Sequence, residues 1–332
     1  MRAFLAERGE PAYRAEQILR WIFGKGARSF SALTDVGREL REALAARFDL
    51  VRLEPERVFR SVDGTRKLVF RSSGGDRFEA VLIPDRKRLT LCVSSQVGCA
   101  MGCKFCATAR LGLRRQLAAE EIVAQYLAAR DILGPEERIT NVVFMGMGEP
   151  LHNLDAVLGA IRILTAPWGP RLASRRITVS TVGLVPGLER LVRETRVQVA
   201  VSLFTADDAT RGEWIPANRR YPVEVLLRTC RALPIPTRRR ITFECVLLRG
   251  VNDSEADAER LAELLRPIRC KVNLIPFNSF PGAPGEPPSS EATRRFQEVL
   301  LRRGIHATVR ASRGRDIGAA CGQLAGSLPA AA

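Results

Sequence analysis

The sequence is poor in histidine, in aromatic residues and in long apolar runs. Of its 332 residues two are histidine, and aromatic residues make up 6%. His152 and His306 alone leave little room for a histidine-rich metal site or a Ser-His-Asp triad. The low aromatic content also argues against a broad platform on which nucleic-acid bases could stack.

Membrane and secretory classes are also disfavoured by what is missing. No apolar run approaches the roughly 18–20 residues that a helix needs to span a bilayer. The start, MRAFLAERGEPAYRAEQ, is charged and has no long apolar segment, so we expect no secretory signal. We therefore expect a cytoplasmic protein with no membrane partner. Its eight cysteines should be thiols, metal ligands or catalysts rather than a disulfide framework.

Positive charge is abundant in the sequence. The 52 Lys+Arg outnumber the 36 Asp+Glu and give a formal charge of +16, and because only five of the 52 are lysine, 47 are arginine. Genome composition can explain part of the preference for arginine, but not the excess charge. A surface this positive favours a phosphate-rich partner such as nucleic acid, because guanidinium groups bind phosphate through two parallel donors. A basic protein without such a partner is the alternative.

The length and the local patterns predict a large domain with an N-terminal appendage. Apolar residues recur at helical spacing within the first 50 residues, and two alternating runs flank Asp63-Gly64. The first pattern predicts helices and the second a β-hairpin. We assign residues 1–82 to an accessory helical and hairpin domain, residues 83–316 to a core domain, and residues 317–332 to a C-terminal tail.

Within the core domain, short apolar runs alternate with amphipathic stretches. The expected strands are residues 89–95, 141–147, 176–181, 197–204, 240–248 and 271–277. The expected helices include residues 119–132, 155–165, 222–233, 255–266 and 289–303. This alternation predicts an α/β protein with a parallel sheet. Six units in about 220 residues favour a partial (β/α)6 barrel over the eightfold barrel, which takes about 250.

Three cysteines follow the first expected strand of the core domain. In GCAMGCKFC, Cys99, Cys103 and Cys106 have C-x3-C-x2-C spacing, and no nearby fourth Cys or His completes the set. Structural zinc usually takes four ligands, commonly in two pairs. A [4Fe–4S] cluster held by three cysteines leaves one iron open, and that iron can bind a small molecule through an amine and a carboxylate. A zinc-stabilised RNA-binding protein without catalysis is the alternative.

The cysteine spacing, with Phe105 before the last cysteine, resembles the radical S-adenosylmethionine (SAM) superfamily, whose fold is a partial (β/α)6 barrel. The segments LCVSSQVGCAMGCKFCATARLG, MGMGEPL, NLIPFNSFPG and CGQLAG narrow the resemblance. They look like the radical SAM adenosine C2-methyltransferases of ribosomal RNA and their C8-methylating relatives. The likeness covers essentially the whole chain, including GEPAYRAEQILRWIF near its start.

This resemblance implies an enzyme that methylates C2 of one adenosine in 23S rRNA, with a tRNA adenosine as a further candidate substrate. The alternative within the resemblance is methylation at C8. The implied cofactors are a [4Fe–4S] cluster, held by the three cysteines, and two SAM molecules per turnover, one as methyl donor and one as radical source. The implied partners are 23S rRNA, tRNA and a one-electron reductant such as flavodoxin or ferredoxin. We expect a monomer.

The resemblance also implies which residues contact SAM. The matching positions are Gly148, Glu149, Ser180, Ser202, Leu203, Phe204 and Asn278. All lie at the ends of expected strands, where the active sites of such barrels are found. At Phe204 the family commonly has histidine, so a hydrogen bond to SAM is lost here if that histidine makes one through its side chain.

Three further residues match the family's catalytic positions. Cys321 matches a cysteine that is methylated on sulfur, loses a hydrogen atom to the radical, and adds its carbon to adenine C2. Cys92 matches the cysteine that attacks the Cys321 sulfur and releases the product as a disulfide forms. Glu79 matches the general base that removes the C2 proton. Without the resemblance, Glu79 would be interpreted as a solvated strand residue.

Overall fold

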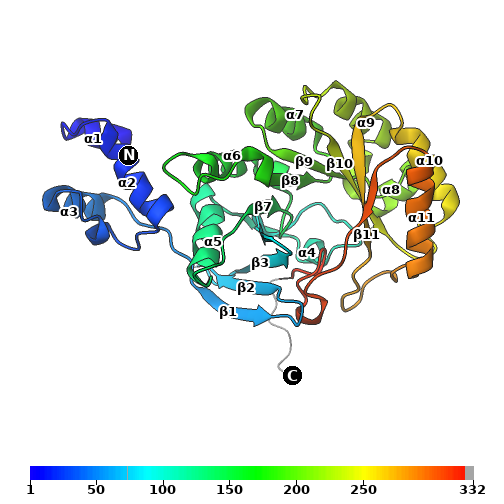
Figure 1. Ribbon diagram of the computed structural model, residues 1–332, viewed down its shortest axis with the longest axis horizontal. Coiled ribbons are helices and arrows are strands. Elements are labelled where there is room, and N and C mark those ends of the chain that lie inside the picture. Colours follow the sequence, from blue (N-terminus) through cyan, green and yellow to red (C-terminus); the bar gives the residue numbers. More distant parts are fainter. Residues whose placement is uncertain (73, 326–332) are drawn as a thin grey trace.

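The computed structural model describes residues 1–72 and 74–325. Figure 1 shows a helical N-terminal part beside a larger body, in which helices surround a curved sheet. Among the described residues, no helix is long and apolar enough to cross a membrane.

The N-terminal part is helical, as the sequence predicts. Its elements are α1 (Arg2–Glu7), α2 (Tyr13–Leu19), a π-helical turn η1 (Arg20–Lys25), a 3₁₀ turn η2 (Phe30–Ala32) and α3 (Arg38–Arg47). They enclose a small apolar core of their own. Phe23 packs against both this core and the core of the larger body, where its ring lies 5.9 Å from that of Trp168.

A ten-stranded sheet forms the centre of the larger body. In spatial order its strands are β1 (Pro55–Arg60), β2 (Arg66–Arg71), β3 (Arg77–Asp85), β4 (Arg88–Cys92), β7 (Asn141–Phe144), β8 (Ile177–Thr181), β9 (Gln198–Ser202), β10 (Ile241–Leu247), β11 (Cys270–Pro276) and β12 (Ala307–Val309). Neighbouring strands pair antiparallel from β1 to β4 and parallel from β4 to β12. A separate antiparallel pair joins β5 (Gln96–Gly98) to β6 (Leu113–Gln116).

The helices alternate with the parallel strands, which confirms the predicted α/β class and partial barrel. They are α4 (Ala107–Arg110), α5 (Ala119–Asp131), α6 (Leu154–Thr165), α7 (Val185–Glu194), α8 (Asp208–Trp214), α9 (Val223–Ala232), α10 (Glu255–Leu265) and α11 (Ser290–Arg302), with 3₁₀ turns η3 (Pro150–Asn153), η4 (Ser174–Arg176), η5 (Pro216–Arg219) and η6 (Arg315–Ile317). All six expected strands are present, as β4 and β7 to β11. The short β12 adds a further parallel strand that the sequence pattern did not predict.

The predicted hairpin is present, but it belongs to the sheet of the barrel. β1 and β2 pair around the turn at Asp63-Gly64, and β3 then joins them to β4. Leu68, Phe70 and Phe78 from this extension lie in the main apolar core, because one face of an antiparallel sheet must be covered. The division at residues 82 and 316 stays a prediction.

Candidate functional site

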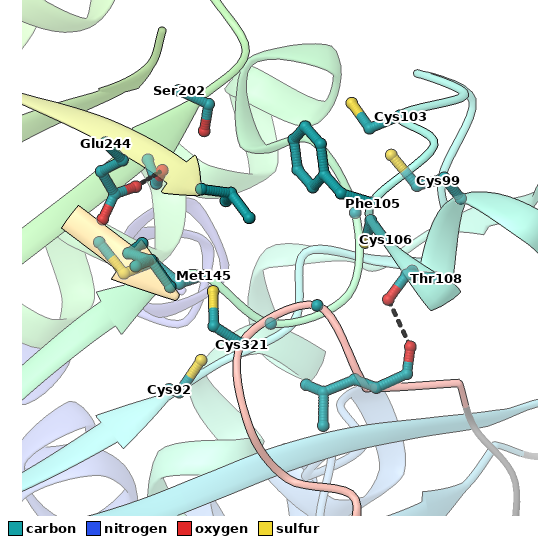
Figure 2. A pocket seen from close by; sticks show the side chains of 18 of the residues that line it. Cys92, Cys99, Cys103, Phe105, Cys106, Thr108, Met145, Ser202, Glu244 and Cys321 are labelled. Carbon is teal, nitrogen blue, oxygen red and sulfur yellow. Dashed lines mark hydrogen bonds between the residues drawn. The ribbon is translucent and has the colours of Figure 1, made fainter. Parts of the chain in front are cut away.

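A cavity of about 160 Å³ opens at the C-terminal ends of the parallel strands (Figure 2). Ten of the 13 predicted site residues line it: Cys92, Cys99, Cys103, Cys106, Gly148, Glu149, Ser180, Ser202, Asn278 and Cys321. They come from the strand ends, from the loop after β5 and from the C-terminal segment. The fold thus gathers residues that are more than 200 positions apart in the chain, such as Cys92 and Cys321.

The loop from Cys99 to Cys106 is held by the β5–β6 pair. The Cys99 amide donates to the Gly112 carbonyl at 2.9 Å. Gly98 has φ +74°, and a Cβ atom there would lie 1.8 Å from the Gly112 carbonyl oxygen, so this position requires glycine. At the other end of the loop, Cys106 precedes α4 as its N-cap residue. All three thiols are free, with Cys99 and Cys103 buried and Cys106 half-buried.

The residues of this loop fit a [4Fe–4S] cluster. Burial, together with the negative charge of Cys106 and Glu149 nearby, raises the pKa of Cys99 to about 12, and the pKa of Cys103 is raised for the same reasons. Thiols of this kind become thiolates only if a cationic group binds them. No three His, Cys, Asp or Glu side chains converge on a single ion in the described part of the chain. Cys99, Cys103 and Cys106 all line the cavity, so a group bound there is within reach of the three thiols.

The segment after β7 places a buried carboxylate at the cavity. Gly148 has φ +101°, and a Cβ atom there would lie 2.5 Å from the Gln96 Cβ. The Gln96 side-chain oxygen accepts the Glu149 amide at 2.7 Å. The Glu149 carboxylate accepts the amides of Leu151 at 3.0 Å and Val182 at 2.9 Å. Burial nevertheless raises the Glu149 pKa to about 7. A carboxylate in such a setting favours a cationic ligand, such as an amino group, beside it.

Leu203 and Phe204 are not brought to the cavity. Both side chains are fully buried behind its wall, and their amides donate to the Glu244 carbonyl at 3.0 and 3.2 Å. The Phe204 ring stacks between Phe105, at 5.4 Å, and Trp214, at 5.6 Å. In this chain the residue in the family's histidine position therefore packs behind the cysteine loop and does not face a ligand with its side chain.

Cys92 and Cys321 lie near one another at the floor of the cavity, as Figure 2 shows. Cys92 ends β4 and is buried, whereas Cys321 is on the C-terminal segment and in contact with solvent. Desolvation raises the pKa of Cys92 to about 12 and that of Cys321 to about 11. Arg310 opposes both shifts because its positive charge favours the thiolates. Both cysteines are free thiols here.

The segment that carries Cys321 is fastened to the barrel mouth. The Asn278 amide nitrogen donates to the Cys321 carbonyl at 3.1 Å, so this predicted SAM contact also positions the segment. The Ala107 amide donates to the Gly322 carbonyl at 2.7 Å, next to Cys106. The Thr108 hydroxyl donates to the Leu324 carbonyl at 2.5 Å, a bond drawn in Figure 2. These bonds hold Cys321 beside the loop of the three cysteines.

Glu79 is buried, and the expectation from the residues alone of a solvated strand residue is wrong. Its side chain is 0% exposed and forms an ion pair with the Lys67 ammonium at 3.2 Å. The other carboxylate oxygen accepts the Ala325 amide at 3.2 Å. Glu79 does not line the cavity, but it contacts the segment that carries Cys321. A charged residue in a strand of alternating polarity usually lies on the solvated face. Here Lys67 and the C-terminal segment cover that face at Glu79.

Glu244 and Arg310 line the cavity and were missed by the sequence analysis. The Ser180 hydroxyl donates to Glu244 Oε2 at 2.7 Å, and Arg310 Nη1 lies 4.0 Å from Glu244 Oε1. Figure 2 places Glu244 on the side of Ser202, across from the three cysteines. The sequence contains one indication of Glu244, since a single glutamate within the apolar run FECVLL is unusual in a buried strand.

Comparisons with known proteins identify the family. The Radical SAM superfamily matches residues 93–262, and the Ribosomal RNA large subunit methyltransferase N-terminal domain matches residues 1–50. A Dual-specificity RNA methyltransferase RlmN from Syntrophobacter fumaroxidans is 52% identical over 316 residues, which cover 95% of this chain and 92% of that protein. The chain belongs to the RlmN family of the radical SAM superfamily.

Further RlmN relatives and a solved structure agree with this. The RlmN of Geobacter sulfurreducens is 49% identical, with 98% of this chain and 90% of that protein covered. A radical SAM methyltransferase from Sphaerobacter thermophilus superposes with a TM-score of 0.93 at 49% identity, over 98% of this chain and 96% of that one. As a radical SAM protein, this RlmN family member uses SAM and a [4Fe–4S] cluster, and a purely structural zinc protein is excluded.

Proposed function

We propose that this RlmN family member is an RNA methyltransferase that places a methyl group on C2 of an adenosine in 23S rRNA and of an adenosine in tRNA. The observation that carries the proposal is the position of Cys321 beside Cys92, in the cavity that the three loop cysteines also line. The name of the relatives, Dual-specificity RNA methyltransferase RlmN, supports RNA as the substrate and a specificity that is not limited to one target.

The proposed residue roles are those that the family resemblance implies, and the geometry of the cavity supports most of them. When bound, the cluster and SAM would supply a 5′-deoxyadenosyl radical and, from a second SAM, a methyl group. Cys99, Cys103 and Cys106 would hold the cluster. Glu149 would bind the SAM amino group, for which its buried carboxylate supplies the opposite charge. Gly148, Ser180, Ser202 and Asn278 would form the remaining walls of the SAM site.

Three side chains would carry out the transfer to RNA. Cys321 would carry the methyl group on its sulfur. After loss of a hydrogen atom the carbon radical would add to C2, and the cluster, when bound, would supply the acceptor for the unpaired electron of the adduct. Glu79 would take the C2 proton, and its bond to the Ala325 amide brings its carboxylate to the Cys321 segment. The Cys92 thiolate would then attack the Cys321 sulfur and form a disulfide. The sulfur–carbon bond breaks with its electron pair left on the carbon, which takes up a proton and becomes the methyl group on C2. Arg310 favours that thiolate by its charge.

The wider organisation is proposed as well. Residues 1–82 would form the accessory part that grips RNA, residues 83–316 the catalytic barrel, and residues 317–332 the tail with the methyl carrier, although residues 326–332 lie outside those described. A one-electron donor such as flavodoxin or ferredoxin would reduce the cluster. The protein would work as a monomer in the cytoplasm.

The test is the Cys321→Ala variant of the anaerobically reconstituted enzyme. We expect it to cleave SAM but to form no methylated RNA, because the carbon carrier is absent. Cys230→Ala is the matched control: Cys230 is a buried thiol on α9 that does not line the cavity, and its loss should leave methylation intact. Mass spectrometry of the digested RNA, which resolves C2-methyladenosine from C8-methyladenosine, is the readout.

Two outcomes would contradict the proposal. Methylated RNA from the Cys321→Ala variant would remove Cys321 from the mechanism. Methylation at C8 alone by the unaltered enzyme would show that the C2 assignment is wrong.

A further inference from the structure

Arg211 on α8 is a charged residue that lies wholly inside the barrel mouth. It is 0% exposed and is among the largest fully buried side chains of the described residues. It lies behind the wall of the cavity rather than in it, at the ends of β8 and β9. A guanidinium is charged at all physiological pH values, so its burial requires an explanation.

The hydrogen bonds of Arg211 go to neutral acceptors. Its guanidinium donates to the carbonyls of Leu203 at 3.0 Å, Val182 at 2.8 Å and Ser202 at 3.2 Å, and to the Asn218 side-chain oxygen at 2.6 Å. Val182 and Ser202 line the cavity. These bonds satisfy the donors and position two of the strand ends that form the cavity wall. They do not neutralise the charge.

No carboxylate within the described ranges lies within 4.0 Å of the Arg211 guanidinium. Asp208 is near enough to act on Arg211 through its charge, but its carboxylate accepts the Asn218 amide at 3.1 Å and the Val223 amide at 2.8 Å instead. A buried charge without an ionic partner is costly in free energy, and such groups in native proteins are normally paired. We therefore expect a negatively charged group to lie close to Arg211 in the functional protein.

Cys103 is the residue near Arg211 whose sulfur would carry negative charge when it binds the cluster. Cys103 packs in one apolar cluster with Phe204, Trp214 and Ile215, which surround the segment that carries Arg211. The cysteine loop is fixed to the same segment, because the Lys104 amide donates to the Trp214 carbonyl at 3.0 Å. Cys103 is near enough to Arg211 for a negative charge on its sulfur to act on the guanidinium. The medium between them is apolar, and charges interact strongly across such a medium.

We propose that Arg211 is the counter-charge of the cluster held by Cys99, Cys103 and Cys106, and that it raises the reduction potential of that cluster. The proposal rests on the proposed cluster ligands. The cluster with its thiolates is anionic and takes one more electron from the external one-electron donor. Because the reduced form is more negative, a fixed buried cation stabilises it more than the oxidised form. Arg211 thus eases the reduction on which SAM cleavage depends and is a positioning residue that never touches SAM.

The test is a redox titration of the reconstituted full-length protein without RNA. Electron paramagnetic resonance of the reduced cluster measures how much of the cluster is reduced at each potential. At a fixed ambient potential, Arg211→Gln should lower the ratio of reduced to oxidised cluster about tenfold, which corresponds to about 59 mV for a one-electron couple. Arg211→Lys keeps the charge but cannot make all the carbonyl bonds, and its ratio should stay within about twofold of the original.

An equal fall in the ratio of reduced to oxidised cluster in Arg211→Gln and Arg211→Lys would overturn the proposal. The effect would then come from the lost hydrogen bonds to the carbonyls and not from the charge. If the Arg211→Gln variant does not bind iron, the same redox titration is carried out on the Asp208→Asn variant. This variant removes the anion that partly offsets Arg211 and should raise the ratio, and an unchanged ratio would refute the proposal. No methylation is measured, so a wrong RNA substrate in the proposed function would leave this result unaffected.

Discussion

At the scale of single residues, Lys67 and Glu79 form a buried ion pair, in which the loss of either charge would remove the ionic partner of the other. Both side chains are at most 4% exposed, and their charged atoms lie 3.2 Å apart. The Lys67 ammonium also donates to the Gly318 carbonyl at 3.3 Å. The pair therefore joins the strands β2 and β3 to the C-terminal segment, next to the cavity. Such pairs tolerate joint replacement better than the loss of one member.

We predict that Lys67→Met lowers the free energy of unfolding by about 3–5 kcal/mol, because the Glu79 charge loses its cation in an apolar setting. The double variant Lys67→Met with Glu79→Leu should recover most of this loss. Lys87→Met, at an exposed position, is the control and should change little. Urea unfolding of the cluster-free protein measures all three. A loss below about 1 kcal/mol for Lys67→Met would contradict the prediction.

Phe204 is a second residue whose role depends on its surroundings. As a histidine position it would be expected to face SAM, yet its ring fills the space between Phe105 and Trp214. Its backbone has φ +72°, an unfavourable conformation for a bulky residue. The Asn252 amide holds this conformation by donating to the Phe204 carbonyl at 2.9 Å. The aromatic stack therefore supports the cysteine loop from behind, and the change from histidine is compatible with the same site.

At the scale of elements, the turn between β1 and β2 fastens the approach to the tail. The Asp63 carboxylate accepts the amides of Thr65 and Gly314, both at 2.9 Å. In return, the Asp316 carboxylate accepts the Ser61 hydroxyl at 2.6 Å and the Val62 amide at 3.2 Å. Two short loops that are about 250 residues apart in the chain thus hold each other a few residues before Cys321.

These bonds predict a specific acid sensitivity. Partial burial raises the pKa of Asp63, but the hydrogen bonds from Thr65 and Gly314 outweigh it and lower the pKa from 3.8 to about 2. A lowered pKa means that the folded state binds fewer protons, so the stabilisation is complete above pH 4 and is lost as the pH falls through 2.

The corresponding variant is Asp63→Asn. We expect it to be less stable than the unaltered protein at neutral pH, and we expect the difference to shrink steadily between pH 4 and pH 2, where about half of Asp63 is itself protonated. Asp49→Asn, at an exposed position, should run parallel to the unaltered protein over the whole range. Thermal unfolding followed from pH 2 to pH 7 gives the comparison. Parallel curves for Asp63→Asn would show that the carboxylate does not secure the two loops.

At the scale of the whole molecule, the N-terminal helices are attached to the barrel by the packing of Phe23 against Trp168 and by a small set of polar contacts. Arg28 pairs with Asp131 at 2.9 Å, and the Arg130 guanidinium donates to the Gly24 carbonyl at 3.0 Å. The helices have a separate apolar core, Figure 1 shows them to one side of the larger body, and none of their residues lines the cavity within the described ranges. This arrangement suits a module that contacts RNA at a distance from the reacting base.

The net charge of +16 predicts a strong dependence of RNA binding on salt. Each phosphate that the protein neutralises releases a counterion, so the association constant should fall at least about tenfold between 50 and 200 mM salt. Binding of SAM at the enclosed cavity should change far less. Filter binding of a labelled substrate RNA and calorimetry with SAM measure the two affinities. An RNA affinity that does not depend on salt would contradict an electrostatic RNA surface.

The sequence by itself determined the α/β class, the order of the six parallel strands and the three cysteines of the loop. These are local properties: apolar periodicity decides whether a segment pairs in a sheet or packs as a helix, and the spacing of Cys99, Cys103 and Cys106 is covalent. The likeness of short segments to a known family was similarly readable, because each segment is contiguous in the chain.

The tertiary structure alone decided which charged groups are buried and what they face. Glu79 is buried where Lys67 and the C-terminal segment cover β3, and Arg211 lies near Cys103 because α8 packs against the cysteine loop. Burial, hydrogen bonding and pKa depend on atoms that are far apart along the chain, so no local pattern reports them. For the same reason, Phe204 packs behind the site in the place where a ligand contact was expected.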